Sequence, residues 1–173
     1  KDPVLHPVNR LFYSKTRDDL KKIIFTVTND LNHDQRMIRI CSSLANAGYS
    51  VILVGTRKIH SSPLTPRNYK QKRLGCLFKA GFGFYAEYNI RLLFFLIFQK
   101  ADIVCCIDLD TILPVWMVCR LKNRKGVYDA HEYFSEQKEV ISRPRVHKVW
   151  KWIEKSFVPR FKNGYTVCES IAR

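Results

Sequence analysis

The stretch that most constrains the fold is "DIVCCID", residues 102–108, in which five apolar residues stand between two aspartates. A strand with no polar position on either face has to be covered on both, as the strands of parallel sheets are. Its two cysteines, Cys105 and Cys106, are adjacent, so their side chains should point to opposite faces. The segment therefore predicts a strand inside a parallel sheet.

Strand and helix patterns alternate along the rest of the chain. Strands are predicted at "IIFTVTND", "YSVILVG", "GVYDAHE" and "GYTVCES", with a more exposed one at "NYKQKRLGCLF". Helices are predicted over 33–48, 84–100, 111–125 and from 145 to about 159. The helix over 84–100 is mostly apolar, and we expect it to be largely covered. The order predicts an α/β fold, a Rossmann-like open parallel sheet with helices on both faces, over residues 23–173 after a basic leader, 1–22.

The polar residues of this pattern gather where the predicted strands end. In open parallel sheets, ligands bind outside the carboxyl ends of the strands. Six candidate residues fall at such ends: Asn29, Asp30, Asp108, Asp110, Asp129 and His131. We expect a binding site there.

The charge balance points to an anionic partner. Thirty Lys and Arg against fifteen Asp and Glu give +15, which suits nucleic acid, a phosphate-bearing substrate or a membrane surface. The six cysteines show no C-x-x-C pair, and we interpret them as reduced thiols of a cytosolic protein. We expect no signal peptide, and the longest apolar stretch, 92–98, is too short to span a bilayer as a helix.

Two kinds of site can be weighed at the strand ends. Four aspartates (Asp30, Asp108, Asp110, Asp129) could hold Mg²⁺ as in Rossmann-like nucleases, or could cap helices and sheet edges. The metal motif H-E-x-x-H is absent because Ser135 stands in place of the second histidine. The first loop, "NDLNHDQR", has no glycine, which argues against a classical nicotinamide or flavin site. Arg36 could meet an anion at the helix start, or be a surface arginine.

The segment "VYDAHEYFSE" combines a histidine with carboxylates. His131 and Asp129 are two residues apart, so on a strand their side chains share a face. A histidine there can exchange a hydrogen bond with a polar substrate group, while carboxylates such as Glu132 orient it. The alternative is a purely structural histidine.

A basic surface is predicted on two segments. Residues 57–73 carry six Lys and Arg and no acidic residue. In the last helix an apolar face is predicted on Val146, Val149, Trp150, Ile153 and Phe157. The remaining face carries Lys148, Lys151, Trp152 and Lys155, which is typical of a helix at a membrane surface. A solvated face with one packed aromatic is the alternative.

A resemblance to a known family covers roughly residues 22–173. The chain resembles the N-terminal domain of family 4 retaining glycosyltransferases, which have the GT-B fold, and most of all bacterial members that build surface polysaccharides. The segments that carry the resemblance are "TNDLNHDQR", "LANAGYSVILVGTRK", "FYAEYNIRLLFFL", "ADIVCCIDLDTILP", "VYDAHEYFSE" and "YTVCESIA".

The resemblance implies roles for single residues. It implies that His131 contacts the donor sugar near the reacting carbon, and that Asp108 and Asp110 line the acceptor cleft. The loop from Asn29 to Arg36 would face the donor phosphates and the acceptor. Members of the family often have glycines in that loop, and this chain has none.

The resemblance also implies the partners. We expect half of a GT-B enzyme, with the C-terminal donor domain absent, that transfers sugar with retention from a nucleotide-sugar to a glycan or lipid-linked acceptor. The nucleotide-sugar is a substrate, and neither a cofactor nor a metal is expected. We expect a peripheral protein on the cytoplasmic, anionic face of the cell membrane rather than a nucleic-acid-binding protein. The alternatives are the Mg²⁺-dependent nuclease and a non-catalytic subunit that binds acceptor and membrane.

Overall fold

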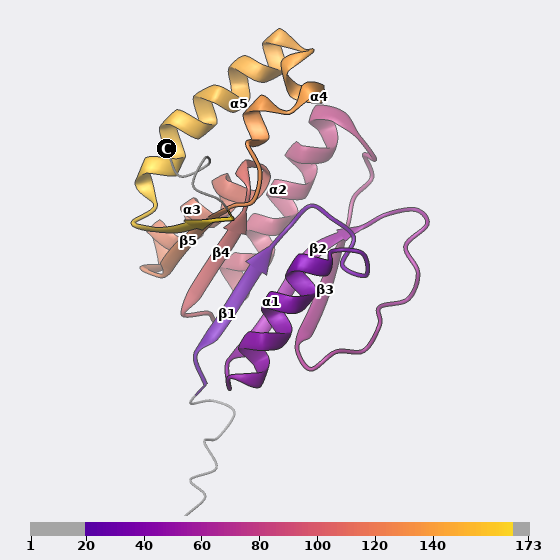
Figure 1. The fold of residues 1–173 in the computed structure, drawn as a ribbon, viewed down its shortest axis with the longest axis vertical. Coiled ribbons are helices and arrows are strands. Elements are labelled where there is room, and N and C mark those ends of the chain that lie inside the picture. The colour runs from indigo at the N-terminus through magenta and orange to yellow at the C-terminus, as the bar shows by residue number, and fades with distance from the viewer. Residues whose placement is uncertain (1–19, 168–173) are drawn as a thin grey trace, which may run out of the picture.

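The chain forms one parallel sheet covered by helices (Figure 1). The computed structural model describes residues 20–167. Its six strands run in the spatial order β3-β2-β1-β4-β5-β6, and all neighbouring pairs are parallel. The strands are β1 (Lys22–Thr26), β2 (Ser50–Arg57), β3 (Lys70–Gly75), β4 (Ile103–Ile107), β5 (Lys125–Ala130) and β6 (Asn163–Thr166).

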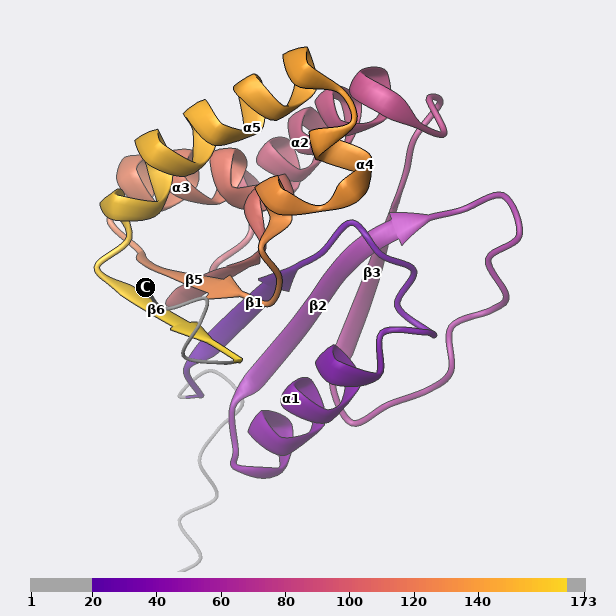
Figure 2. The same ribbon diagram turned by 45° about the horizontal axis from the view of Figure 1, so that its top comes forward.

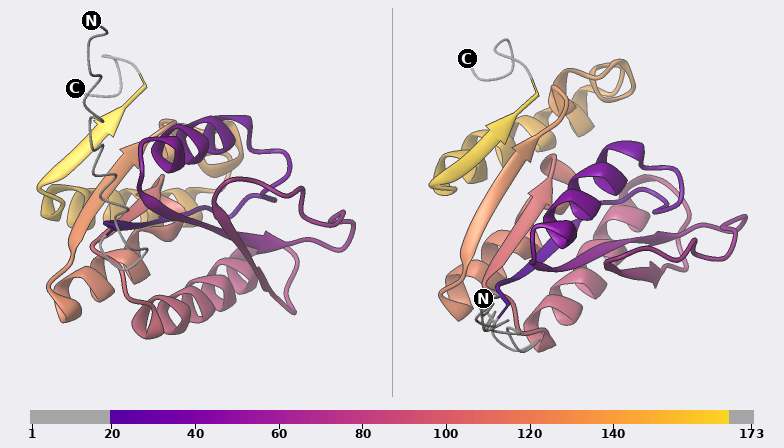
Figure 3. Two further views of the ribbon diagram at one scale, coloured as in Figure 1. Left: turned by 90° about the horizontal axis from the view of Figure 1, so that it is seen from below. Right: turned by 60° about the horizontal axis from the view of Figure 1, so that its bottom comes forward.

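Helices lie on both faces of the sheet, as predicted. They are α1 (Gln35–Asn46), α2 (Gly81–Phe98), α3 (Ile112–Lys122), α4 (Lys138–Ile141) and α5 (Pro144–Phe157). Among the described helices, α1 covers one face, while α2, α3 and α5 cover the other (Figures 2 and 3). The predicted leader lies mostly outside the described residues, and its last residue, Lys22, begins β1.

The core is divided by the sheet into two clusters. On the side of α2, the buried side chains include Tyr88, Leu92 and Leu96 of the helix. On the side of α1, they include Met37 and Cys41 of that helix. The central strands β1 and β4 contribute to both clusters, because successive side chains of a strand point to opposite faces.

The prediction for the adjacent cysteines is confirmed. Cys105 lies in the cluster on the α1 side and Cys106 in the cluster on the α2 side. All cysteines of the described segment are free thiols, and Cys168 lies outside that segment.

Both ends of β4 are tied to neighbouring strands next to an aspartate. Before the strand, the carboxylate of Asp102 accepts a hydrogen bond from the backbone N–H of Lys22 at 2.7 Å, and its own N–H donates to the Lys22 carbonyl at 2.9 Å. After the strand, the N–H of Asp108 donates to the carbonyl of Asp129 at 2.9 Å. These contacts join β4 to β1 at one end and to β5 at the other.

Helix α1 is capped at its start by Asp34 and is followed by Gly48. The Asp34 carboxylate accepts a hydrogen bond from the N–H of Met37 at 3.0 Å, which satisfies a donor of the first turn. Gly48 follows the helix with φ +86°, a conformation that glycine adopts without the steric cost of a side chain.

Two predictions about covered surfaces are wrong in part. Helix α2 buries only one side, and Ile90, Phe94 and Phe98 are exposed. In α5, Val146 and Val149 are exposed as well, although Ile153 is buried as predicted. Apolar composition shows which residues favour burial, but only the neighbouring elements decide how much of a helix is covered. Within residues 20–167, no helix is long and apolar enough to cross a membrane.

Gly55 in β2 leaves room for the loop that follows β1. A Cβ added at Gly55 would lie 2.4 Å from Cδ2 of Leu31 and 2.6 Å from the carbonyl oxygen of Asn29. We expect Gly55→Ala to lower the free energy of unfolding by about 1–3 kcal/mol, because the loop would have to shift. Urea unfolding tests this, with Gly75→Ala as the control, since a Cβ there meets no atom within 4 Å. An equal loss in both variants would contradict the steric explanation.

Candidate functional site

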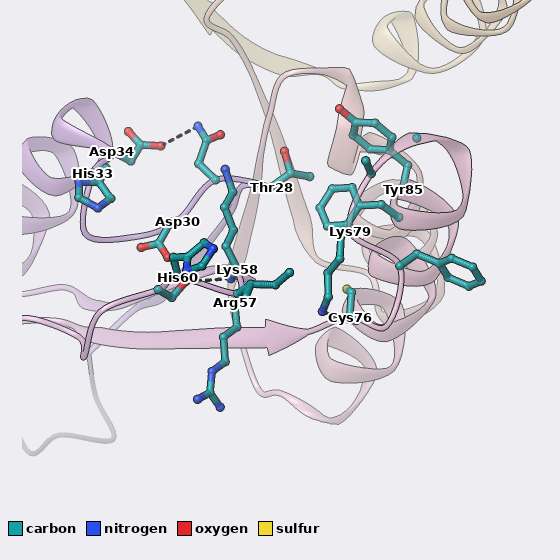
Figure 4. A pocket seen from close by; sticks show the side chains of 17 residues that line it. Thr28, Asp30, His33, Asp34, Arg57, Lys58, His60, Cys76, Lys79 and Tyr85 are labelled. Atoms are coloured by element: carbon teal, nitrogen blue, oxygen red, sulfur yellow. Dashed lines mark hydrogen bonds between the residues drawn. The ribbon is translucent and has the colours of Figure 1, made fainter.

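A cleft of about 760 Å³ opens at the carboxyl ends of β1, β2 and β3 (Figure 4). The loops after these strands and the first turns of α2 form its walls. Its lining combines basic side chains with aromatic ones: His33, Arg57, Lys58, His60 and Lys79 with Phe78, Phe84 and Tyr85. Of the predicted site residues, Asn29 and Asp30 line this cleft.

Asp30 forms hydrogen bonds to several segments at the cleft. Its carboxylate accepts hydrogen bonds from Arg73 at 2.6 Å, from the N–H of Asn32 at 3.1 Å and from the hydroxyl of Ser61. Burial alone would raise the pKa of Asp30, but these hydrogen bonds and the Arg73 charge outweigh it, so the pKa lies below its ordinary value. Asp30 therefore connects the loop after β1 to the loop between β2 and β3.

Asp110 lies behind the cleft wall, at the start of α3. It accepts a hydrogen bond from the hydroxyl of Thr28, which lines the cleft, while its Oδ1 has no hydrogen-bond partner among the described residues. Burial raises the pKa of Asp110 to about 7, and the charge of Asp108 adds to the rise. The pKa of the Asp110 carboxyl group therefore lies near neutral pH.

Asp108 organises the segment that carries His131. Its Oδ1 accepts hydrogen bonds from the backbone N–H groups of His131 at 2.8 Å and Glu132 at 3.1 Å. The backbone of Asp108 has φ 56° and ψ −173°, a region that non-glycine residues rarely adopt because it is strained. Burial raises the pKa of Asp108 to about 6, although the two N–H groups act against that rise.

The His131 ring lies among carboxylates and is partly open to solvent. Its Nδ1 is 4.0 Å from Oδ2 of Asp108 and 3.8 Å from Oε1 of Glu132, and 39% of the side chain is exposed. Glu132 is itself exposed and accepts a hydrogen bond from Gln137. This arrangement leaves the imidazole accessible to a ligand at the carboxyl edge of the sheet.

Arg36 and Asp129 form a partly buried ion pair. The guanidinium of Arg36 on α1 lies 2.6 Å from the carboxylate of Asp129 on β5. The side chain of Asp129 is fully buried. Burial would lower the pKa of Arg36, but the hydrogen bond and charge of Asp129 raise it above its ordinary value. The pair joins α1 to β5, so part of the charge predicted to meet an anion is compensated within the protein.

The four aspartates of the nuclease alternative do not converge. Asp30 is bound to Arg73, Asp129 to Arg36, Asp108 to backbone N–H groups, and Asp110 to Thr28. Within the described part of the chain, no group of three His, Cys, Asp or Glu side chains is arranged to hold a metal ion. The geometry therefore gives the Mg²⁺-dependent nuclease no support.

The predicted membrane face of α5 is only partly free. Lys148, Trp152 and Lys155 are exposed. Lys151, however, forms ion pairs with Glu136 at 2.6 Å and Glu154 at 3.1 Å. These hydrogen bonds raise the pKa of Lys151, and they fix its ammonium against the protein.

The sequence analysis gave no role to several side chains that line the cleft, among them His60, Lys79 and Tyr85, and it included His33 only as part of the loop from Asn29 to Arg36. His60 and Lys79 follow β2 and β3, and His33 follows β1. Their position after predicted strands could have identified the residues of the loops, because the loops after neighbouring parallel strands meet at one edge of the sheet.

The raised pKa of Asp110 predicts a pH-dependent stability. The folded state holds the Asp110 proton more tightly than the unfolded chain, so the contribution of Asp110 to wild-type stability falls as pH rises from about 4 to about 7. The shift from 3.8 to about 7 corresponds to at most about 4 kcal/mol. We expect Asp110→Asn to gain stability relative to wild type over this range, measured by urea unfolding at several pH values. The exposed Glu139→Gln is the control, and a pH-independent difference for Asp110→Asn would contradict the prediction.

No protein-family model and no curated protein sequence matches the chain. Solved structures do match. The sucrose-phosphate synthase from Thermosynechococcus elongatus is 10% identical over 85% of this chain and 47% of that chain, with a TM-score of 0.56. UGT89C1 from Arabidopsis thaliana, complexed with UDP-L-rhamnose, is 13% identical over 86% and 52%, with a TM-score of 0.50. A putative UDP-N-acetylglucosamine 2-epimerase from Listeria monocytogenes is 10% identical over 88% and 40%, with a TM-score of 0.50.

At these identities the likeness shows the fold alone. The chain spans about half the length of these proteins or less. The likeness and the six-stranded parallel sheet confirm the predicted Rossmann-like fold, of the kind that forms one half of a GT-B protein.

Proposed function

We propose that the chain is the acceptor-side domain of a glycosyltransferase, which moves a sugar from a nucleotide-sugar to a glycan or lipid-linked acceptor. The observation that carries the proposal is the cleft at the carboxyl edge of the sheet, where ligands of such sheets bind. The fold supports it, because UGT89C1, which matches this chain, was solved with UDP-L-rhamnose.

The sequence resemblance supplies the finer parts of the proposal. It supports a retaining enzyme of family 4 that makes bacterial surface polysaccharide and needs neither a metal nor a cofactor. The nucleotide-sugar would be held mainly by a second domain, and the acceptor by this one. The protein would work on the cytoplasmic face of the cell membrane, at its anionic lipids.

The geometry suggests a separate role for each of the predicted site residues. His131 and Glu132 are accessible and would contact the donor sugar. Asn29 lines the cleft and would meet acceptor hydroxyls, while the buried Asp110 would act on the cleft through the hydroxyl of Thr28. Asp30 and Asp108 would act mainly by positioning, because their oxygens already accept hydrogen bonds from the protein. Arg36 would contribute to the electrostatic potential beside the donor phosphates while paired with Asp129.

The chemistry of the cleft also suggests the character of the acceptor. Lys58 and Lys79 come from opposite walls of the cleft, with His60 beside Lys58 (Figure 4). Phe84 and Tyr85 supply apolar surface on the wall formed by α2. An acceptor with an anionic group and an apolar face, such as a lipid-linked sugar phosphate, suits this lining.

The first test is His131→Ala in a protein that combines this domain with a donor-binding domain. We expect turnover to fall by about 10²-fold or more, because a contact to the reacting sugar is lost. The melting temperature should change little, since the side chain is partly exposed. His147→Ala is the matched control, because His147 lies on α5 with a similar exposed fraction and also has a glutamate partner. A destabilised but fully active His131→Ala variant would show that His131 is structural.

The second test concerns the basic face of α5. Lys148→Gln/Lys155→Gln should weaken binding to anionic vesicles by about 30-fold at low salt, since each lysine near such a surface contributes about 1 kcal/mol. Co-sedimentation at low and high salt measures this, and high salt should reduce the difference. Lys151→Gln is the control, because its ammonium is already paired within the protein. Equal binding of the wild type to neutral and anionic vesicles would contradict the proposal.

A further inference from the structure

The outer side of α2 carries a row of uncovered apolar side chains. Ile90, Phe94 and Phe98 follow one another at intervals of four residues and are 56%, 58% and 80% exposed. Residues four apart lie on the same face of a helix, so the three form one line. Phe78, which precedes the helix and packs against Gly83, is also exposed. We call Phe78, Ile90, Phe94 and Phe98 the α2 stripe.

Helix α3 exposes further apolar side chains on the same side of the sheet as α2. It packs alongside α2 on the same face of the sheet (Figure 2). Its exposed side chains include Met117 and Leu121, the latter 70% exposed. Soluble domains seldom expose apolar surface over two adjacent helices, and where they do, it usually marks an interaction site.

The charges around the α2 stripe are mainly positive. Basic residues lie before, within and after α2 and along α3: Lys79, Arg91, Lys100, Arg120 and Lys122. The acidic residue of α2, Glu87, accepts hydrogen bonds from the N–H groups of Leu77 and Phe78 and is paired with Arg91 at 2.7 Å. Apolar side chains flanked by cations are the combination that binds anionic lipid surfaces.

From these contacts we infer that the α2 stripe, with Met117 and Leu121, is the surface that contacts a bilayer of anionic lipids. A second copy of the chain fits less well, because two such faces would bring like charges together in a protein of net charge +15. The inference rests on the membrane part of the proposed function and is independent of the sugar chemistry.

The position of Phe78 connects this surface to the cleft. Phe78 lines the cleft on one side and a shallow apolar hollow, formed with Gly83, Ala86 and Ile90, on the other. A protein lying on a bilayer by the α2 stripe would therefore hold the mouth of its cleft near the lipid headgroups. An acceptor attached to a lipid could enter the cleft without leaving the membrane.

The test is the double variant Phe94→Gln/Phe98→Gln, assayed by co-sedimentation with vesicles of phosphatidylglycerol and phosphatidylcholine. Both side chains are exposed, and glutamine is a good helix former, so we expect an unchanged melting temperature. Binding should fall at least about tenfold, because two phenyl groups no longer enter the interface. The loss should persist at high salt, unlike that caused by the lysine variants of α5. Tyr49→Gln is the control, because it removes an exposed aromatic side chain that follows α1, the helix of the opposite face.

Each outcome decides between distinct conclusions. If the double variant binds anionic vesicles as tightly as the wild type does, the assignment to α2 is wrong, while the proposed membrane association remains. No binding by the wild type to anionic vesicles would overturn both. A wild-type dimer in light scattering that the double variant converts to monomer would assign the surface to a second copy instead.

Discussion

The burial of β1 and β4 on both faces is the constraint on which the rest of this structure depends. Their backbone groups are paired with strands on either side, and their side chains fill two separate cores. A polar side chain inside these strands would be buried without water, at a cost of several kcal/mol unless it found a partner. The buried Thr26 of β1 has such partners in Cys105 and Thr111. The polar residues of the site that belong to these two strands' segments follow the strands, as Asn29 follows β1 and Asp108 follows β4.

Much of the fold could be predicted from sequence because burial follows composition. Between its two aspartates, "DIVCCID" has no polar residue, which predicts a strand covered on both faces, and the structure has it as the central strand β4. The coverage of α2 could not be predicted in the same way. Its sequence is apolar almost all round, but the sheet and α3 reach only part of its circumference, and Phe94 and Phe98 remain outside.

The location of the candidate site could be predicted from the sequence, but the hydrogen-bond and ion-pair partners of its residues could not. The carboxyl edge follows from the parallel sheet alone, and the predicted residues do lie there. Their partners depend on contacts between segments far apart in the sequence, such as Arg36 with Asp129, 93 residues away, or Thr28 with Asp110, 82 residues away. These contacts give the aspartates different characters: the pKa of Asp30 is lowered by its partners, whereas that of Asp110 is raised by burial. No local pattern distinguishes such carboxylates.

The two aspartates that border β4 have a consequence for how the chain assembles. Between them the strand is apolar on both faces, so a slide of one residue past β1 would still bury apolar side chains on each side. Hydrophobic burial alone does not choose between those alignments, but the contacts of the two aspartates do. A slide past β1 would break the hydrogen bonds of Asp102 to Lys22, and a slide past β5 would break those of Asp108 to His131 and Glu132. Asp108 therefore serves both the edge of the site and the correct pairing of the central strands. Any evolutionary change of this residue would act on the accuracy of folding as well as on ligand chemistry.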